Sequence, residues 1–216
     1  LAALCLCLTL LPAAALAESG SIDQAKFFVD SWGDLRDTLT NSTEAVINAQ
    51  LTQGITWEEG SIVIPAGKTV TLNLPDGCNI DAKNSGTAIQ VRGNLIINGN
   101  QNGMITQGAA TDGSPAGGIY IAPGGRVTMN GGMIANCSAG TQTATGVGGV
   151  YVSEGATFEM NAGYITQCSG GNERNLLDSP HAASVLNKGT FTINNSASIW
   201  DSKGGSLFAG IVLYNS

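Results

Sequence analysis

Apolar residues recur in short pairs along most of this chain, with one residue between the two members of each pair. Side chains two positions apart point to the same face of an extended strand, whereas the i, i+3, i+4 spacing of a helix is not sustained in these segments. Each copy of the pattern has a first pair, a second pair and a single isoleucine, which predicts three short strands per copy. The first pairs are Ile62/Ile64, Ile89/Val91, Ile119/Ile121, Val150/Val152, Ala183/Val185 and Ile211/Leu213. The second pairs are Val70/Leu72, Leu95/Ile97, Val127/Met129, Phe158/Met160 and Phe191/Ile193, and the third positions are Ile80, Ile105, Ile134, Ile165 and Ile199.

The repeat is clearest in residues 118–138 and 149–169, which carry the same 21-residue pattern 31 positions apart without a gap. Similarity at a fixed period of 20–50 residues marks a stacked architecture. Three strands in about 30 residues fit a parallel β-helix better than a leucine-rich repeat or a WD-type propeller, whose signatures are missing. We therefore expect an all-β fold, a right-handed parallel β-helix.

An asparagine directly follows the second strand in five copies. In a stack of coils these side chains would lie one above another, about 4.8 Å apart, and could form a ladder of amide hydrogen bonds. The predicted ladder consists of Asn73, Asn98, Asn130, Asn161 and Asn194. The extra residues of the longer copies fall mainly after the third strand, in 107–117, 138–148, 169–182 and 201–209, so one edge of the stack should carry variable loops.

The chain divides into three expected parts. Residues 1–17 resemble a signal peptide that lacks its basic n-region, because an apolar run is followed by Ala15-Leu16-Ala17, the form of a cleavage site. Residues 18–60 should hold a short N-terminal capping helix, with Ser31 and Asp34 at its start, and a partial leading coil. Residues 61–216 should form about five coils, truncated at the C-terminus.

Several of these segments resemble bacterial surface or secreted proteins of the pectate-lyase-like, right-handed parallel β-helix superfamily. The resemblance lies in Ser31-Trp32-Gly33-Asp34-Leu35, in the run IPAGKTVTLN that begins at Ile64, and in the G-G-[IV]-Y-[IV] coils. It implies a secreted or cell-surface location and the β-helix fold. It implies no particular activity, because the superfamily includes lyases, hydrolases, adhesins and passive stalks.

Charge excludes some partners. The chain has 9 Lys and Arg against 16 Asp and Glu, a net charge of −7, and such a surface argues against nucleic acid. No transmembrane segment is expected after residue 17. A carbohydrate or a host or cell-surface ligand is the expected partner, and the module should be a monomer within a longer chain.

Candidate chemistry is sparse. The aspartates are scattered, no cofactor is expected, and no zinc-like pattern of ligands occurs. Asp178 and His181, in the longest loop, are the weak catalytic candidates. Tyr120 and Tyr151 should stack on an outer face as a short aromatic stripe that could bind sugar or simply stabilise the sheet. Cys137 and Cys168 occupy equivalent positions in adjacent coils, either as two buried thiols or as a disulfide.

The sequence favours a non-catalytic, adhesin-like or structural surface module that presents variable corner loops. Two alternatives stay open: a fragment of a polysaccharide lyase or hydrolase whose catalytic coils lie outside this chain, and a glycan-binding module that uses the two tyrosines.

Overall fold

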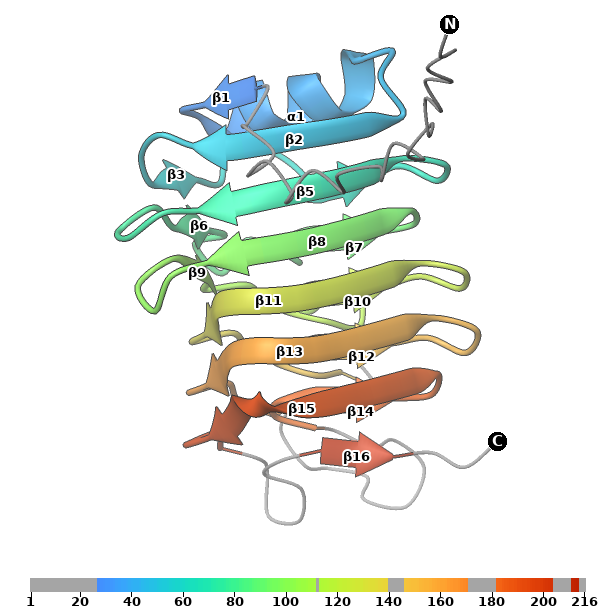
Figure 1. Ribbon diagram of the computed structural model, residues 1–216. Helices are drawn as coiled ribbons and strands as arrows, with labels where there is room; N and C mark the ends of the chain where they lie inside the picture. The colour runs from blue at the N-terminus through green and yellow to red at the C-terminus, as the bar shows by residue number, and fades with distance from the viewer. Residues whose placement is uncertain (1–26, 112, 140–145, 171–181, 204–210, 214–216) are drawn as a thin grey trace, which may run out of the picture.

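The computed structural model describes residues 27–111, 113–139, 146–170, 182–203 and 211–213. In these residues the chain is all-β, with two parallel sheets and one short helix (Figure 1). The expected signal peptide lies outside the described residues.

The large sheet has ten strands and the small sheet has six. The large sheet contains β1 (Phe27–Val29), β2 (Val46–Leu51), β3 (Ile55–Thr56), β5 (Thr69–Leu74), β6 (Ile80–Asp81), β8 (Asn94–Gly99), β9 (Met104–Thr106), β11 (Arg126–Ala135), β13 (Thr157–Thr166) and β15 (Thr190–Trp200). The small sheet contains β4 (Ile62–Ile64), β7 (Ile89–Val91), β10 (Ile119–Ile121), β12 (Val150–Val152), β14 (Val185–Asn187) and β16 (Ile211–Leu213). Every one of these strand pairs is parallel, and from the second repeat on each repeat adds a strand to both sheets.

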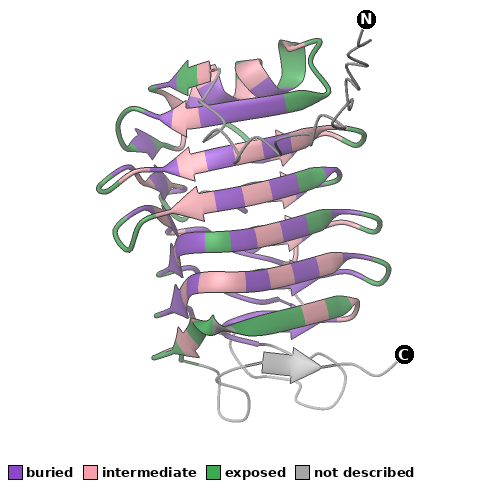
Figure 2. Cartoon of the chain, in the orientation of Figure 1, coloured by how far each residue is buried: buried purple, intermediate pink, exposed green. Residues whose placement is uncertain are grey.

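The core lies between the sheets and is built from the paired apolar positions. The third-position isoleucines stand in register from Ile55 through Ile80, Ile105, Ile134 and Ile165 to Ile199. Along β5 and β7 the inward residues are buried and the intervening ones are partly exposed, as Figure 2 shows for the sheet that faces the viewer. The alternation read from the sequence therefore identifies the buried face.

One pairing expected from the sequence is wrong. Val150 lies beside Val185, and Val152 lies beside Asn187, so the first pair of that copy is Val185/Asn187 and not Ala183/Val185. The reason is turn length. Residues 153–156 link β12 to β13, whereas only Lys188 and Gly189 link β14 to β15, and this moves the preceding strand two positions along the chain.

The later repeats also differ from the expected three separate strands. β5 and β6, like β8 and β9, are separated by a loop, but β11, β13 and β15 each run through the corner as one strand. The register shifts near Asn130 and Ala162, which marks an irregularity that bends the strand without ending it. In both kinds of repeat the asparagines of the predicted ladder lie inside strands and not after them.

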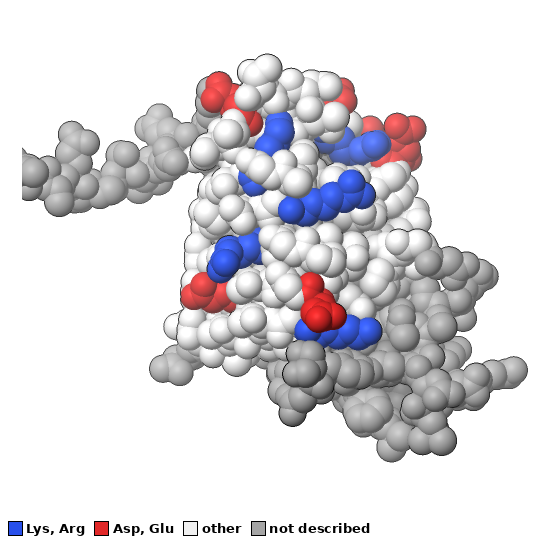
Figure 3. All heavy atoms as spheres, turned by 90° about the vertical axis from the view of Figure 1, so that its right-hand side faces the viewer, with Lys and Arg blue, Asp and Glu red and all other residues white. Residues whose placement is uncertain are grey.

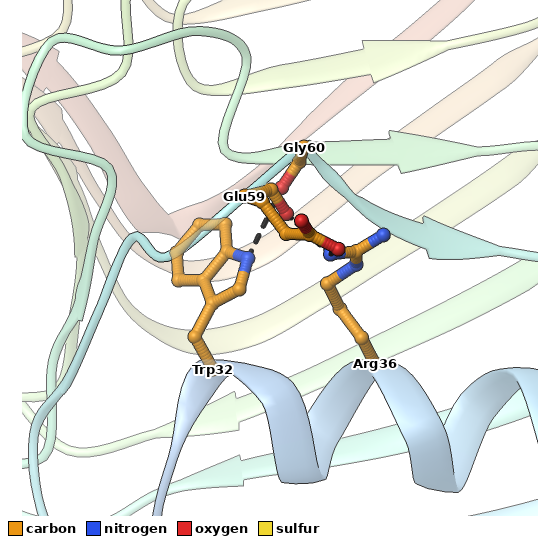
Figure 4. A network of polar contacts seen from close by, with 4 residues as sticks. All are labelled: Trp32, Arg36, Glu59 and Gly60. Carbon is orange, nitrogen blue, oxygen red and sulfur yellow. Dashed lines mark hydrogen bonds and ion pairs between the residues drawn. The ribbon is translucent and has the colours of Figure 1, made fainter.

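Helix α1 (Trp32–Asn41) covers the N-terminal end of the stack (Figure 1). The Ser31 hydroxyl accepts a hydrogen bond from the Asp34 backbone N–H, which caps the helix. Trp32, Leu35 and Leu39 are buried against the first coil. Figure 4 shows how the helix is fastened: Trp32 Nε1 donates to the Gly60 carbonyl over 3.1 Å, and Arg36 pairs with Glu59.

At the other end of the described stack, β15 pairs only with β13 among the described strands. Ile193 and Trp200 on this strand are 44% and 52% exposed. No helix in the part of the chain that the structure describes is long and apolar enough to cross a membrane.

Candidate functional site

The predicted asparagines form a continuous column at one corner of the large sheet. Their side-chain amides are linked from each repeat to the next by hydrogen bonds of 2.6–3.2 Å, and Asn48, which the sequence analysis had not included, adds a further bond of 2.7 Å at the N-terminal end. The order is Asn48, Asn73, Asn98, Asn130, Asn161 and Asn194, and in each bond the Nδ2 of the later residue donates to the Oδ1 of the earlier one. Because each inner residue donates one hydrogen bond and accepts one within the column, these amides stabilise the corner and keep only part of their hydrogen-bonding capacity for a ligand.

A groove lies beside this column, where the shape of the corner changes. Eight positions separate Ile97 from Ile105, but only five separate Met129 from Ile134 and Met160 from Ile165. The longer connection, residues 100–103, projects as a loop, whereas the next repeats turn directly through the strand. The step between a projecting loop and a flat corner produces a hollow of about 500 Å³.

Glycines form much of the base of this groove. Gly131, Gly132 and Gly163 line it, and Gly132 and Gly163 have φ values of 83° and 93°, which favour glycine. A Cβ atom on Gly163 would lie 2.5 Å from the Gly132 carbonyl oxygen, closer than any side chain tolerates. The flat corner therefore requires glycine, because backbone atoms of the neighbouring repeat fill the space that a side chain would occupy.

Polar side chains surround the glycines. Asn100, Gln101 and Asn102 come from the projecting loop, Asp76 comes from the loop before it, and Tyr164 comes from the outer face of β13. None of these five side chains hydrogen-bonds to another described residue, in contrast to the asparagine column. A smaller hollow of about 310 Å³ continues the groove past Asn73 and Asn98 on the other side of the loop.

This set of groups suits a neutral, hydroxyl-rich ligand. Amide side chains offer donors and acceptors together, and a tyrosine offers an apolar ring face with a polar tip. The volume falls in the range of about 300–1,000 Å³ that is common for small-ligand sites. The sequence analysis did not identify this groove; the drop in spacing from eight to five was the available signal.

The two tyrosines of the predicted aromatic stripe lie outside the groove, in more apolar surroundings. Tyr120 and Tyr151 lie side by side in register, with ring centroids 5.8 Å apart. Tyr151 is only 9% exposed, since it packs with Val147 and Leu186 in a separate apolar cluster. Leu186 is the next residue in this row, in register with Tyr151. Such burial favours a packing role for the pair over a sugar-binding platform.

Cys137 and Cys168 are free, buried thiols in adjacent repeats. The hydrogen bond between the two thiols, together with burial, raises the pKa of Cys137 well above its usual range. The same hydrogen bond lowers the pKa of Cys168, although burial acts in the opposite direction. The pair lies in the core and does not line the groove.

The weak catalytic candidates, Asp178 and His181, lie outside the described residues. Within the ranges that the structure describes, no three His, Cys, Asp or Glu side chains are grouped closely enough to hold a metal ion. Asp76 is the one carboxylate that lines the groove.

Comparisons of the chain with protein-family models, with curated proteins and with solved structures found no match.

Proposed function

We propose that this chain is a non-catalytic recognition module, secreted or displayed on a bacterial surface, that binds a neutral glycan in the groove beside the asparagine column. The observation that carries the proposal is the groove itself. It combines three amide side chains and a tyrosine that have no described hydrogen-bond partner with a base of bare glycine backbone.

We further propose that the module is a right-handed parallel β-helix of the pectate-lyase-like superfamily. Two features support it: strand pairing always joins equivalent segments of successive repeats, and all of the pairs are parallel. Parallel strands joined by a crossover within one sheet are right-handed in about 98% of cases. The segments at Ser31 and Ile64 carry the resemblance to the superfamily, which also suggests secretion.

The groove chemistry supports binding over cleavage. Most glycoside hydrolases use two carboxyl groups on opposite sides of the scissile bond, about 5–9.5 Å apart. Asp76 is the single carboxylate in the groove, and it has no carboxylate partner there among the described residues. A metal-assisted lyase would need a cluster of ligands, which the described residues do not form.

The bases of the variable loops support an adhesin-like role in addition. Ala109, Ser138, Ser169 and Lys203 are joined in a parallel row of bridges, and Ala116, Val147 and Ala182 form a second row. The bases of the loops in successive repeats are therefore aligned and held to one another by backbone bridges. Such a scaffold can present several loops toward one partner.

Binding to an array of neutral oligosaccharides, followed by calorimetry on the best ligand, tests the glycan proposal. We expect Tyr164→Ala to weaken binding about tenfold, because an aromatic contact to a ligand contributes about 1–2 kcal/mol. Tyr120→Ala is the matched control, since it removes the same side chain from the outer face of the small sheet and should leave the affinity unchanged.

Three outcomes would contradict the proposal. The wild-type protein could bind none of the neutral glycans, or Tyr120→Ala could weaken binding as much as Tyr164→Ala, which would favour the tyrosine stripe. Release of new reducing ends from a bound glycan, abolished by Asp76→Asn, would show an enzyme.

A further inference from the structure

Basic side chains collect on the edge of the stack opposite the groove. This turn edge consists of the turns that lead from the small sheet to the large one: residues 65–68, 92–93, 122–125, 153–156 and 188–189. Figure 3 faces this edge and shows Lys and Arg side chains arranged along the stack, with acidic residues mainly near its two ends.

Three of these side chains lie in consecutive repeats, staggered along the strand direction, and we call them the basic row: Lys68 and Arg92 in the turns, and Arg126 as the first residue of β11. They belong to three consecutive repeats, because Arg126 lies in register with Asn94, and Asn94 lies in register with Thr69. No Asp or Glu occurs in residues 65–68, 92–93 or 122–126. Glu154 is in the next turn, and the Arg36–Glu59 pair lies at the helical end.

The row keeps most of its hydrogen-bonding capacity. Lys68 Nζ donates one hydrogen bond, to the Ser42 carbonyl over 2.6 Å. The guanidinium groups of Arg92 and Arg126 make no hydrogen bond or ion pair with any described residue, and both residues are exposed. Glu159 faces outward two positions beyond Thr157, the residue in register with Arg126, and no ion pair joins Glu159 to Arg126.

We propose that the basic row binds a single linear chain of an anionic polysaccharide. Successive repeats are about 4.8 Å apart, so the row offers one positive charge in each of three neighbouring repeats along the stack. Guanidinium groups can bind carboxylate, sulfate or phosphate groups in a bidentate manner, and these three anions share the required chemistry. The site is separate from the neutral-glycan groove and does not depend on it.

The shape of the row favours a polysaccharide over other polyanions. A nucleic-acid duplex or an anionic membrane needs a broad basic surface, whereas this row has one cation in each of three repeats and Glu154 in the turn of the next repeat. Binding of single-stranded nucleic acid usually depends on aromatic side chains that stack on the bases. The turns that hold the basic row contain no aromatic residue.

The experiment compares the wild-type protein with two double variants of equal charge. Arg92→Gln/Arg126→Gln removes two charges from the basic row, and Lys83→Gln/Lys203→Gln removes two charges from elsewhere in the stack. Alginate, dextran sulfate and a teichoic acid supply carboxylate, sulfate and phosphate groups, with neutral dextran and a thymidine oligonucleotide as comparisons. Binding is measured at low and at physiological salt, and circular dichroism checks that each variant is folded.

We expect the wild-type protein to bind at least one of the three anionic polysaccharides, more tightly at low salt, and neither comparison polymer. The row variant should bind about tenfold more weakly, because it loses two charge-assisted contacts that salt partly screens, while the control variant stays within about twofold. Equal weakening by both variants, no binding to any anionic polysaccharide, or tighter binding to the oligonucleotide would overturn the proposal. Tyr164→Ala should leave this binding intact, which separates the two sites.

Discussion

The two long edges of the stack, the asparagine corner and the turn edge, use polar residues in opposite ways. At the corner, six asparagine side chains bond to one another in a closed column. At the turn edge, the guanidinium groups of Arg92 and Arg126 bond to no described residue. Polar groups that hydrogen-bond to each other stabilise the fold. Polar groups without a partner in the protein can instead form hydrogen bonds with a ligand.

The backbone shows the same difference, and the largest expected effect follows from it. Gly163 at the corner and Gly124 at the turn edge both have positive φ, of 93° and 80°. A Cβ on Gly163 would collide with the Gly132 backbone, whereas a Cβ on Gly124 would meet nothing within 4 Å. We expect Gly163→Ala to lower the free energy of unfolding by about 3 kcal/mol or more, because strain and collision add together.

Gly124→Ala is the control for this prediction, since only the strain of a left-handed residue applies there, about 1–2 kcal/mol. Urea unfolding of the two variants measures the difference. Equal midpoints would mean that the corner is no more tightly packed than the turn edge.

The second prediction concerns the side chains of the two edges. Asn130→Ala removes two hydrogen bonds of the column and leaves the Oδ1 of Asn98 and the Nδ2 of Asn161 without their partners. We expect a loss of about 1–2 kcal/mol in the free energy of unfolding, because these groups are only partly shielded from water. Asn94→Ala, near the turn edge, removes one exposed bond to Thr69 and should change stability by less than about 0.5 kcal/mol. A smaller effect for Asn130→Ala than for Asn94→Ala would contradict a stabilising role for the column.

Much of the fold could be predicted from the sequence because each inward position is fixed by a local rule. Residues two apart face the same side of a strand, so Val127 and Met129 could be assigned to the core without knowledge of their neighbours. The pairing of Val185 could not be assigned in this way. The pairing depends on whether the turn between β14 and β15 has four residues or two. Lys188 and Gly189 are not apolar, so the hydrophobic pattern does not show how long this turn is.

The two candidate ligand sites were harder to predict, because each combines residues from different repeats. Tyr164 reaches the same groove as Gln101 only because residues 100–103 project and the following corners do not. Lys68, Arg92 and Arg126 are 24 and 34 positions apart, which matches neither the period of 31 nor each other. The repeats between them differ in length, with 25 positions from Leu72 to Ile97 and 32 from Ile97 to Met129.

The smallest predicted effect tests where the basic row ends. Glu154 lies in the turn of the repeat that follows Arg126, between the basic row and Lys188. Glu154→Gln removes a negative charge from the adjacent turn without adding a contact, so we expect anionic polysaccharide to bind about two- to threefold more tightly at low salt, with the gain lost as salt is raised. Asp201→Asn makes the same change of charge at the opposite side of the stack, where Asp201 accepts a hydrogen bond from Gln167. If this control strengthened binding as much as Glu154→Gln does, net charge alone would explain the attraction, and the turn edge would have no advantage over the rest of the surface.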